Sequence, residues 1–406
     1  MGDEELIPHL FRTEYRKIVS VLCKRFGFAQ MEIAEDIASD TFLTATQAWG
    51  LDSLPKNPTA WLYNVAKNKA KNYLQRHNLF ENKIAPELRN NSDGIYEIDL
   101  SPQNITDSQL QMMFAICNPC ISPEAQVGLA LRVLCGFGID EIAGAFLTNK
   151  ETINKRLFRA KEKLRAENIN IELPPDADID NRLSSVLTTI YLLFNEGYYS
   201  SNQNQILRKE LCLEAMRLCL MLLENKSTNK PQVNALLSLM CFHASRFEAR
   251  VDENGKLILY EDQDESLWDA DLVSKGGYFL HCATGGSNLS KYHLEAGIAY
   301  WNTKKEDTKE KWENILQLYN RLLQKEYSPV AALNRTYALS KANGKQAAII
   351  AAEKLQLTGN HFYFALLGEL YTGIDNEKAK INFQQAFSLA KTDVGKRAIQ
   401  KKIEKL

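Results

Sequence analysis

The chain has 406 residues, of which 45% are hydrophobic, and its formal net charge is -1. This length is too great for one ordinary core and predicts two or three domains. The balanced charge excludes a uniformly basic nucleic-acid-binding surface, although it permits local basic patches.

The sequence carries no signal for export or membrane insertion. The first ten residues, MGDEELIPHL, lack a basic segment followed by a long apolar core, and no apolar run approaches 18 residues. We therefore expect a soluble, cytoplasmic protein with no membrane partner. The eight cysteines are scattered through apolar helical patterns, which predicts buried free thiols.

Cys117 and Cys120 have the C-x-x-C spacing of metal and redox sites. No second pair completes a tetrahedral zinc site, and no strand–helix–strand pattern surrounds the motif. We therefore expect neither a metal nor a cofactor.

Residues 1–76 predict a compact unit of three helices. Apolar residues recur at helical spacing up to Leu22, and the first helix should end near Gly27. A second helix is expected from about Gln30 to Trp49. The first half of this second helix has an acidic face made of Glu32, Glu35, Asp36 and Asp40.

Asn57 and Pro58 predict the capped start of a third helix over residues 59–76. Its later part has a basic, amide-rich outer face with an interleaved aromatic, made of Lys67, Asn68, Lys69, Lys71, Asn72, Tyr73 and Arg76. Such a face suits phosphate contacts and base stacking, although a charged helix end is more often simply solvated. Residues 77–109 show no sustained period and are interpreted as a linker.

Residues 110–170 predict a second helical domain. Ser122 and Pro123 open a helix expected over 124–135. Two short helices follow within 138–165, separated by a turn at Leu147, Thr148 and Asn149. Thr148 and Glu151 have the spacing of a capping box, so the second of these helices should begin there.

The buried stripe of that last helix is Ile153, Leu157, Ala160 and Leu164. Its other face is basic and carries amides near its start: Asn149, Lys150, Thr152, Asn154, Lys155, Arg156 and Arg159. This is the shape of a helix-turn-helix that fits a DNA major groove. A surface hairpin with solvated charges remains the alternative on this stretch alone.

The order of these segments over residues 5–168 resembles the bacterial RNA polymerase sigma factors of the extracytoplasmic-function type. The resemblance is carried by AEDIASDTFLTATQAW, NPTAWLYNVAKNKAKNYLQR, the linker and EIAGAFLTNKETINKRLFRAKEKL. It implies that residues 1–76 bind core RNA polymerase and the minus-ten promoter element, and that residues 110–170 bind the minus-thirty-five element.

The resemblance also assigns roles to residues. It places the polymerase-binding surface at Glu35, Asp36, Asp40, Thr41 and Phe42. It places minus-ten contacts at Trp61, Lys67, Asn68, Lys71, Asn72, Tyr73 and Arg76, with a looser match of loop 53–57 to the loop near an extruded base. It places minus-thirty-five contacts at Asn149, Lys150, Thr152, Asn154, Lys155, Arg156 and Arg159.

Two positions depart from the family pattern. Asn72 stands where members commonly have Asp, which removes a negative charge. Lys150 and Glu151 open the recognition helix where many members have small residues. The promoter sequence of relatives therefore does not transfer to this chain.

Residues 180–406 predict a further helical domain. Successive apolar-periodic segments are followed by residues that pair at an offset of 34, namely Leu333 and Leu367, Tyr337 and Tyr371, Ile349 and Phe383, Ala352 and Ala386, and Leu355 and Leu389. That offset is the tetratricopeptide period, although chance similarity between amphipathic helices is the alternative. The acidic segment 261–269 lacks calcium-loop spacing and is expected to be solvated or to cap a helix.

The whole chain resembles the subgroup of these sigma factors with a tetratricopeptide-like extension, which we expect to fold back on the sigma domains or to hold a regulatory protein. The main alternative is a helix-turn-helix transcriptional regulator with a tetratricopeptide-like sensing domain, which would leave residues 1–76 without a purpose. A scaffold with decayed DNA-binding elements is a third interpretation. We do not expect an enzyme, because the sequence has no phosphate loop, nucleophile elbow or metal-ligand cluster.

Overall fold

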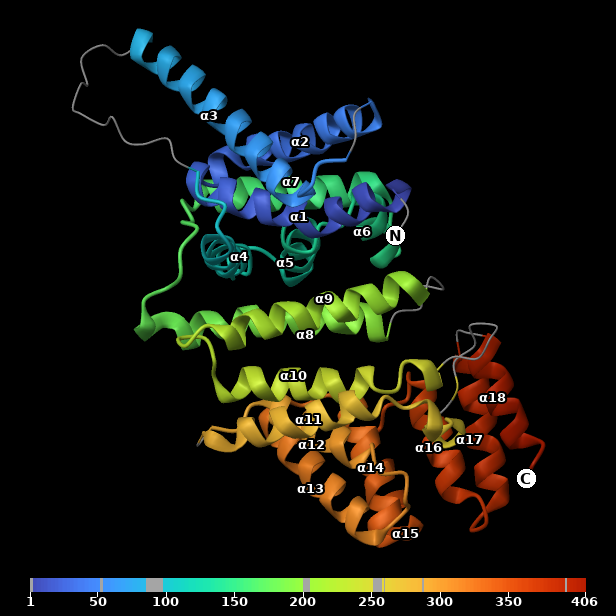
Figure 1. Ribbon diagram of the computed structural model, residues 1–406. Helices are drawn as coiled ribbons and strands as arrows, with labels where there is room; N and C mark the ends of the chain where they lie inside the picture. Colours follow the sequence, from blue (N-terminus) through green and yellow to red (C-terminus); the bar gives the residue numbers. More distant parts are fainter. Residues whose placement is uncertain are drawn as a thin grey trace. The chain divides into compact units, whose positions relative to one another are not determined.

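The computed structural model describes residues 3–51, 54–84, 98–199, 205–250, 258, 260–286, 288–390 and 393–406. Within these residues all regular structure is helical, which confirms the expected all-α fold (Figure 1). The chain divides into two compact units, the first extending to Val233 and the second beginning at Asn234. In the described part of the chain no helix is long and apolar enough to cross a membrane.

The first unit begins with three helices, α1 (Asp3–Phe26), α2 (Met31–Leu51) and α3 (Pro58–Ile84). α1 lies at the centre of this unit because it packs against both α2 and α4 and buries Tyr15, Ile18 and Leu22. It ends at Phe26 and is followed by Gly27, whose φ of 77° is one that glycine adopts without strain. α3 continues past Arg76, into the segment interpreted as a linker.

The next helices of the first unit are α4 (Pro102–Ile116), α5 (Pro123–Leu129), α6 (Ile139–Ala145) and α7 (Lys150–Ala166). Ser122 caps α5 as expected, but α5 does not run to Cys135. From Ala130 to Leu134 the backbone forms a π-helical turn. Such turns are rare and are often found at functional sites, and this one carries Arg132.

α6 and α7 form the expected helix-turn-helix, with one correction to its turn. Asn149, not Thr148, caps α7, because the Asn149 side chain accepts a hydrogen bond of 2.8 Å from the Thr152 amide. The Thr148 amide instead donates to the Ala143 carbonyl. Leu147 has a φ of 49° within this turn. The N-cap of α7 therefore lies one residue later than the capping-box spacing predicts.

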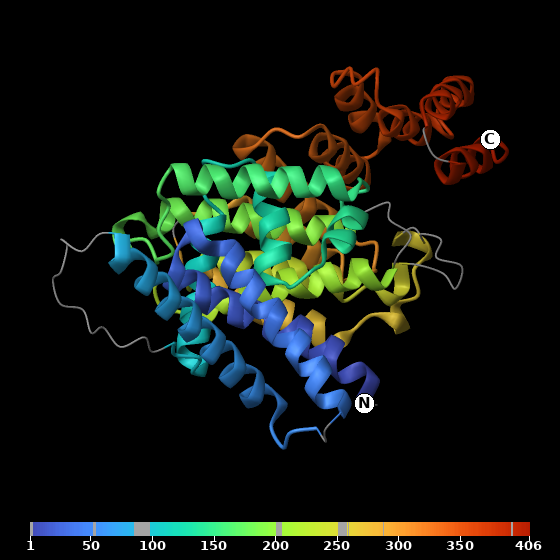
Figure 2. The same ribbon diagram turned by 90° about the horizontal axis from the view of Figure 1, so that it is seen from above.

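α8 (Asp176–Tyr198) and α9 (Gln205–Glu224) lie side by side as a hairpin in both ribbon views (Figures 1 and 2). Gly197 allows this approach, because a Cβ there would lie 2.5 Å from the Arg208 carbonyl oxygen. The Arg208 guanidinium donates to the carbonyls of Gly197 and Tyr198 at 3.0 and 3.1 Å and so covers the end of α8. The α8–α9 hairpin packs against α4, α5 and α6 and therefore belongs to the first unit.

The boundary between the units falls within α10 (Pro231–Ala244). Asp269 caps α11 through the Leu272 amide, as expected for the acidic segment. The second unit continues with α11 (Ala270–Cys282), α12 (Lys291–Trp301), α13 (Lys309–Lys325), α14 (Pro329–Asn343), α15 (Lys345–Glu353), α16 (His361–Tyr371), α17 (Asn376–Leu389) and α18 (Asp393–Ile403).

The 34-residue repeat coincides with successive helical hairpins. Leu333 and Tyr337 lie in α14, and their repeat partners Leu367 and Tyr371 lie in α16. In the same way Ile349 and Ala352 lie in α15, and their partners Phe383 and Ala386 lie in α17. Seven of the ten paired positions are buried in one core, and Leu355 packs against it. Among the seven, Ala352, Phe383 and Ala386 are almost fully buried.

Candidate functional site

The first half of α7 presents the basic face expected of a recognition helix. Asn154, Lys155 and Arg159 are exposed, whereas Ile153 and Leu157 are buried on the opposite side. Arg156 is half-buried, with its guanidinium 5.4 Å from the centre of the Phe146 ring. Arg159 therefore reaches solvent freely, while Arg156 is held by an aromatic ring from the preceding helix.

Other members of the set predicted to contact the minus-thirty-five element have local partners. The side-chain oxygen of Asn149 caps α7, and its side-chain NH2 group remains able to donate to a ligand. Lys150 pairs with Asp140 of α6 at 2.6 Å, and Lys155 pairs with Glu151 at 2.6 Å. Both pairs are well exposed, so they hold the lysines only weakly and a phosphate can replace the carboxylate.

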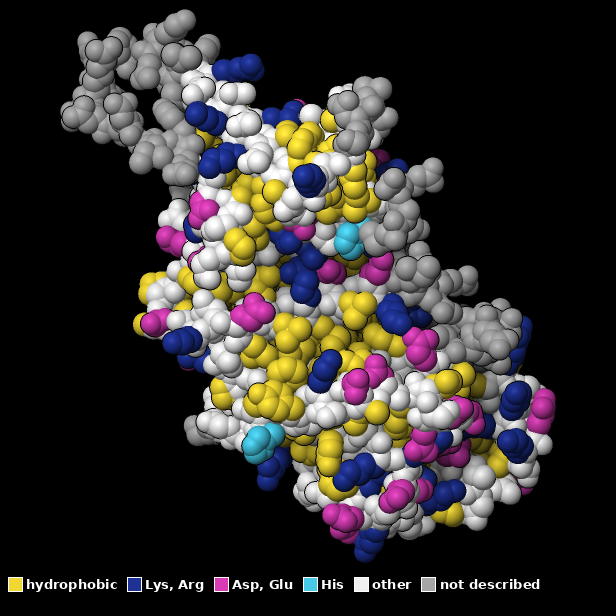
Figure 3. Space-filling model, viewed as in Figure 1, with side chains coloured by type: hydrophobic (Ala, Val, Ile, Leu, Met, Phe, Trp, Pro, Cys, Tyr) yellow, Lys and Arg dark blue, Asp and Glu magenta, His cyan; other side chains and the backbone are white. Residues whose placement is uncertain are grey.

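The predicted minus-ten set divides into exposed and packed side chains along α3. Asn68, Lys71, Asn72 and Arg76 are exposed, and Lys and Arg side chains stand along this helix in the space-filling view (Figure 3). Trp61 instead packs edge-on against Trp49, with ring centres 5.3 Å apart.

The other two minus-ten candidates also have neighbours. Tyr73 packs against Phe26 with ring centres 5.6 Å apart. Lys67 lines a hollow between α3 and residues 98–100. Hydrogen bonds from Ser101 lower the pKa of Asp99, and the positive charge of Lys67 lowers it further. The end of the linker thus lies beside the basic face of α3.

The structure describes residues 54–57 of loop 53–57. Ser53 lies outside the described residues. Asn57 caps α3, because its side-chain oxygen accepts a 3.0 Å hydrogen bond from the Ala60 amide.

The acidic face of α2 carries the predicted polymerase-binding residues, and they have three different environments. Thr41 and Phe42 are buried, with the Thr41 hydroxyl bonded to the Ile37 carbonyl and the Phe42 ring packed on Phe11. Of this predicted set, only the carboxylates are therefore left to contact a partner. Asp36 and Asp40 are exposed, and Asp40 lies 3.9 Å from Lys69 of α3.

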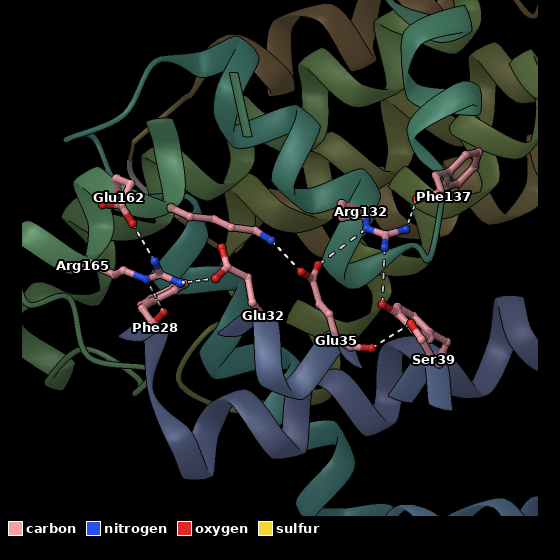
Figure 4. A network of polar contacts seen from close by, with 10 residues as sticks. Phe28, Glu32, Glu35, Ser39, Arg132, Phe137, Glu162 and Arg165 are labelled. Carbon is pink, nitrogen blue, oxygen red and sulfur yellow. Dashed lines mark hydrogen bonds and ion pairs between the residues drawn. The ribbon is translucent and has the colours of Figure 1, made fainter. Parts of the chain in front are cut away.

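Glu35 is covered by side chains from the helix-turn-helix domain (Figure 4). Its carboxylate pairs with Lys161 of α7 at 2.6 Å and with Arg132 of the π turn at 3.6 Å. Only 13% of the Glu35 side chain and 11% of the Lys161 side chain are exposed. The second half of α7 therefore lies on the face of α2 that was predicted to bind polymerase.

Neighbouring contacts extend this interface (Figure 4). Arg165 of α7 donates to the Phe28 carbonyl at 2.9 Å and lies 3.4 Å from Glu32. Arg132 also donates to the Phe137 carbonyl at 3.3 Å and to the Tyr15 hydroxyl at 3.5 Å. Burial raises the pKa of Tyr15 to about 12, so its hydroxyl remains neutral beside this cation.

The α8–α9 hairpin contacts both sigma-like domains. Arg12 of α1 pairs with Glu210 of α9 and, at 2.7 Å, with Glu141 of α6. Glu214 of α9 pairs with Arg16 of α1 at 2.7 Å and with Arg217 at 2.7 Å. Arg217 in turn donates to the Leu134 carbonyl at 2.7 Å. One helix of the extension is thereby joined to α1 and to the π turn.

The sequence interpretation missed these interdomain residues, and only a weak signal marks them. Lys161 follows Ala160 and lies one turn from Leu157 and from Leu164, so a cation borders the buried stripe of α7. Arg16 likewise follows the buried Tyr15. A charge at the edge of an apolar stripe indicates a partner carboxylate, but it does not say on which helix.

Cys117 and Cys120 are free thiols, and the described residues hold no cluster that could bind a metal ion. Burial raises the pKa of Cys117 to about 12, which makes its thiol a poor nucleophile at neutral pH.

The chain is similar in sequence to proteins of a known family. The family model of sigma-70 region 2 matches residues 10–79, which are α1, α2 and most of α3. The extracytoplasmic-function (ECF) RNA polymerase sigma-E factors of Escherichia coli (strain K12) and Salmonella typhimurium (strain LT2) are 28% identical over 171 residues, covering 40% of this chain and 86% of theirs. The chain belongs to the ECF-type sigma factors. Members of this family are non-catalytic transcription initiation factors.

The extension of this sigma factor matches a family of unknown function, DUF6596, over residues 182–284. An uncharacterized protein of Rhizobium meliloti (strain 1021) is 32% identical over 371 residues, covering 89% of this chain and 87% of its own. The match therefore includes at least parts of both sigma domains and most of the extension of this chain. No solved structure matches the chain.

Proposed function

We propose that this sigma factor directs core RNA polymerase to promoters with a minus-ten and a minus-thirty-five element and helps to open the DNA. The observation that carries the proposal is the presence of two separate basic, amide-bearing faces, on α3 and on α7, in one chain with the acidic face of α2. Phosphate contacts from the cations would position each domain on the duplex, and amides beside them suit base edges.

The residues proposed to act are the exposed ones of each set. On α7 these are Asn154, Lys155 and Arg159, supported by Arg156. On α3 they are Asn68, Lys71, Asn72 and Arg76, with Trp61 and Tyr73 as rings at the helix surface. On α2 the exposed carboxylates of Asp36 and Asp40 would meet a basic surface of core polymerase, together with Glu35 once its contacts with Lys161 and Arg132 are released.

The helical domain after residue 175 is proposed to regulate these activities. Support comes from α9, whose Glu210 and Glu214 contact Arg12 and Arg16 of the first domain, while Arg217 contacts the second domain. Release or strengthening of these contacts would change how the two sigma domains move relative to each other. A regulatory protein bound by the second unit is one way to supply that change.

The experiment is reconstitution. Purified chain is mixed with purified core polymerase and fragmented genomic DNA, and core binding and run-off transcripts are measured. Binding to core with promoter-dependent transcripts supports the proposal. A chain that binds specific DNA without core and directs no transcripts would instead be the helix-turn-helix regulator.

A further inference from the structure

Two surfaces of α7 serve different contacts. The exposed side of residues 154–159 carries Asn154, Lys155 and Arg159. Lys161 and Arg165, closer to the end of the helix, instead contact Glu35 and Glu32 of α2. The same helix therefore offers a basic face to solvent while it covers the acidic face of its own chain.

From this arrangement we infer that α7 occupies the polymerase-binding face of α2, so that the chain has a closed form that must open before it binds core polymerase. Lys161 and Arg132 occupy the positions around Glu35 that a basic surface of the polymerase would need. The Glu35 carboxylate cannot be covered by these two side chains and by the polymerase at the same time. The inference rests on the proposed function, because it takes the acidic face of α2 as the site for polymerase.

Gly136 shows how tightly the closed form is built. Its φ is 76°, and a Cβ at this position would lie 3.1 Å from the Arg12 carbonyl oxygen of α1. Arg12 also lies 5.6 Å from the centre of the Phe137 ring and pairs with Glu141. The helix-turn-helix domain thus contacts α1 as well as α2, through backbone, ring and ion-pair contacts.

The length of promoter DNA gives an independent reason for opening. The two elements are named for positions about 25 base pairs apart, which is about 85 Å along a straight duplex. In the closed form a path leads from Lys155 along α7 to Lys161, which lies 2.6 Å from Glu35. From Glu35 it continues along α2 to Asp40, which lies 3.9 Å from Lys69 of α3. With a helix rise of 1.5 Å per residue this path is no longer than roughly 50 Å. The two DNA-binding faces cannot reach both elements until α7 leaves α2.

If only the open form binds polymerase, the apparent dissociation constant equals that of the open form divided by the fraction of molecules that are open. The test uses the full-length chain with Lys161→Met, which keeps the length and packing of the side chain but removes its charge. Lys163→Met is the matched control, because it removes the same charge from the exposed face of the same helix. We expect Lys161→Met to tighten binding to purified core polymerase about tenfold if a tenth of the parent is open, and Lys163→Met to leave it within twofold of the parent.

Carbodiimide crosslinking followed by peptide mass spectrometry observes the closed form directly. It should join the Lys161 amine to the Glu35 carboxylate in the free chain, and saturating core polymerase should diminish that crosslinked peptide. A crosslink that is absent from the free chain, or one that persists undiminished in the core-bound chain, would overturn the inference.

The binding results separate the two proposals. Equal affinity of the parent and Lys161→Met for core overturns the closed form but leaves the proposed function standing. A failure of the parent and Lys161→Met alike to bind core overturns the proposed function together with this inference.

Discussion

The guanidinium of Arg16 in α1 lies 2.7 Å from the carboxylate of Glu214 in α9, with only 9% and 17% of the two side chains exposed. Glu214 also pairs with Arg217, so one carboxylate balances two cations at the join between the extension and the sigma domains. A group in this position contributes to stability chiefly because its loss leaves charges buried without a partner.

Glu214→Gln should therefore destabilise the first unit by about 3 kcal/mol, the typical effect of breaking a buried ion pair. Urea unfolding followed by circular dichroism measures the change. Glu224→Gln is the matched control, because Glu224 lies in the same helix and is exposed. Equal unfolding curves for the two variants would show that the pair does not hold α9 to α1.

The same carboxylate predicts an acid-dependent loss of stability. Burial opposes ionisation of Glu214, but Arg217 and Arg16 outweigh it and hold its pKa below the ordinary value of 4.5. A carboxyl whose pKa is lower in the folded state stabilises the fold above its unfolded pKa and loses that contribution as the pH falls through its folded pKa. The stability difference between the parent and Glu214→Gln should be constant near neutral pH and shrink below pH 4.5. A difference that does not change with pH would contradict this assignment.

Gly197→Ala should destabilise the α8–α9 hairpin. Its Cβ would lie 2.5 Å from the Arg208 carbonyl oxygen and 2.6 Å from the Cys212 sulfur, so the two helices would have to separate. Overpacking of this kind costs about 1–3 kcal/mol, measured as a lower thermal midpoint. Gly277→Ala in α11 is the control: a Cβ there has no atom within 4 Å, and alanine favours a helix by about 1 kcal/mol. Similar behaviour of both variants would contradict the close approach at Gly197.

Helix positions and the sigma-like order of motifs could be predicted from the sequence because each rests on local spacing. The apolar stripe of α7, the Ser122 and Asn57 caps and the 34-residue repeat all depend on residues close in the chain or at a fixed offset. The pairing of Glu35 with Lys161 could not be predicted, because the two residues are 126 positions apart and nothing local selects the partner. For the same reason Glu35 was assigned to the predicted polymerase-binding surface and not to a contact within the chain, and the π turn that carries Arg132 has no spacing signal.

Arg159→Ala should weaken binding of the polymerase-bound chain to promoter DNA and reduce its salt dependence. An exposed guanidinium that contacts a phosphate releases about one counterion, so the slope of log affinity against log salt should fall by about 1. Titration of a labelled promoter fragment at several salt concentrations measures this slope. Arg397→Ala, an exposed arginine of α18, should leave it unchanged. A slope for Arg159→Ala equal to that of the parent would exclude a phosphate contact.

Transcription with purified components tests the central claim most directly. Core polymerase alone and core polymerase with the full-length chain are compared on fragmented genomic DNA, and the 5′ ends of the transcripts are sequenced. We expect the chain to add transcripts that start at a defined distance downstream of a shared two-part motif. Identical transcripts with and without the chain, together with no binding to core, would contradict its assignment as a promoter-specificity subunit.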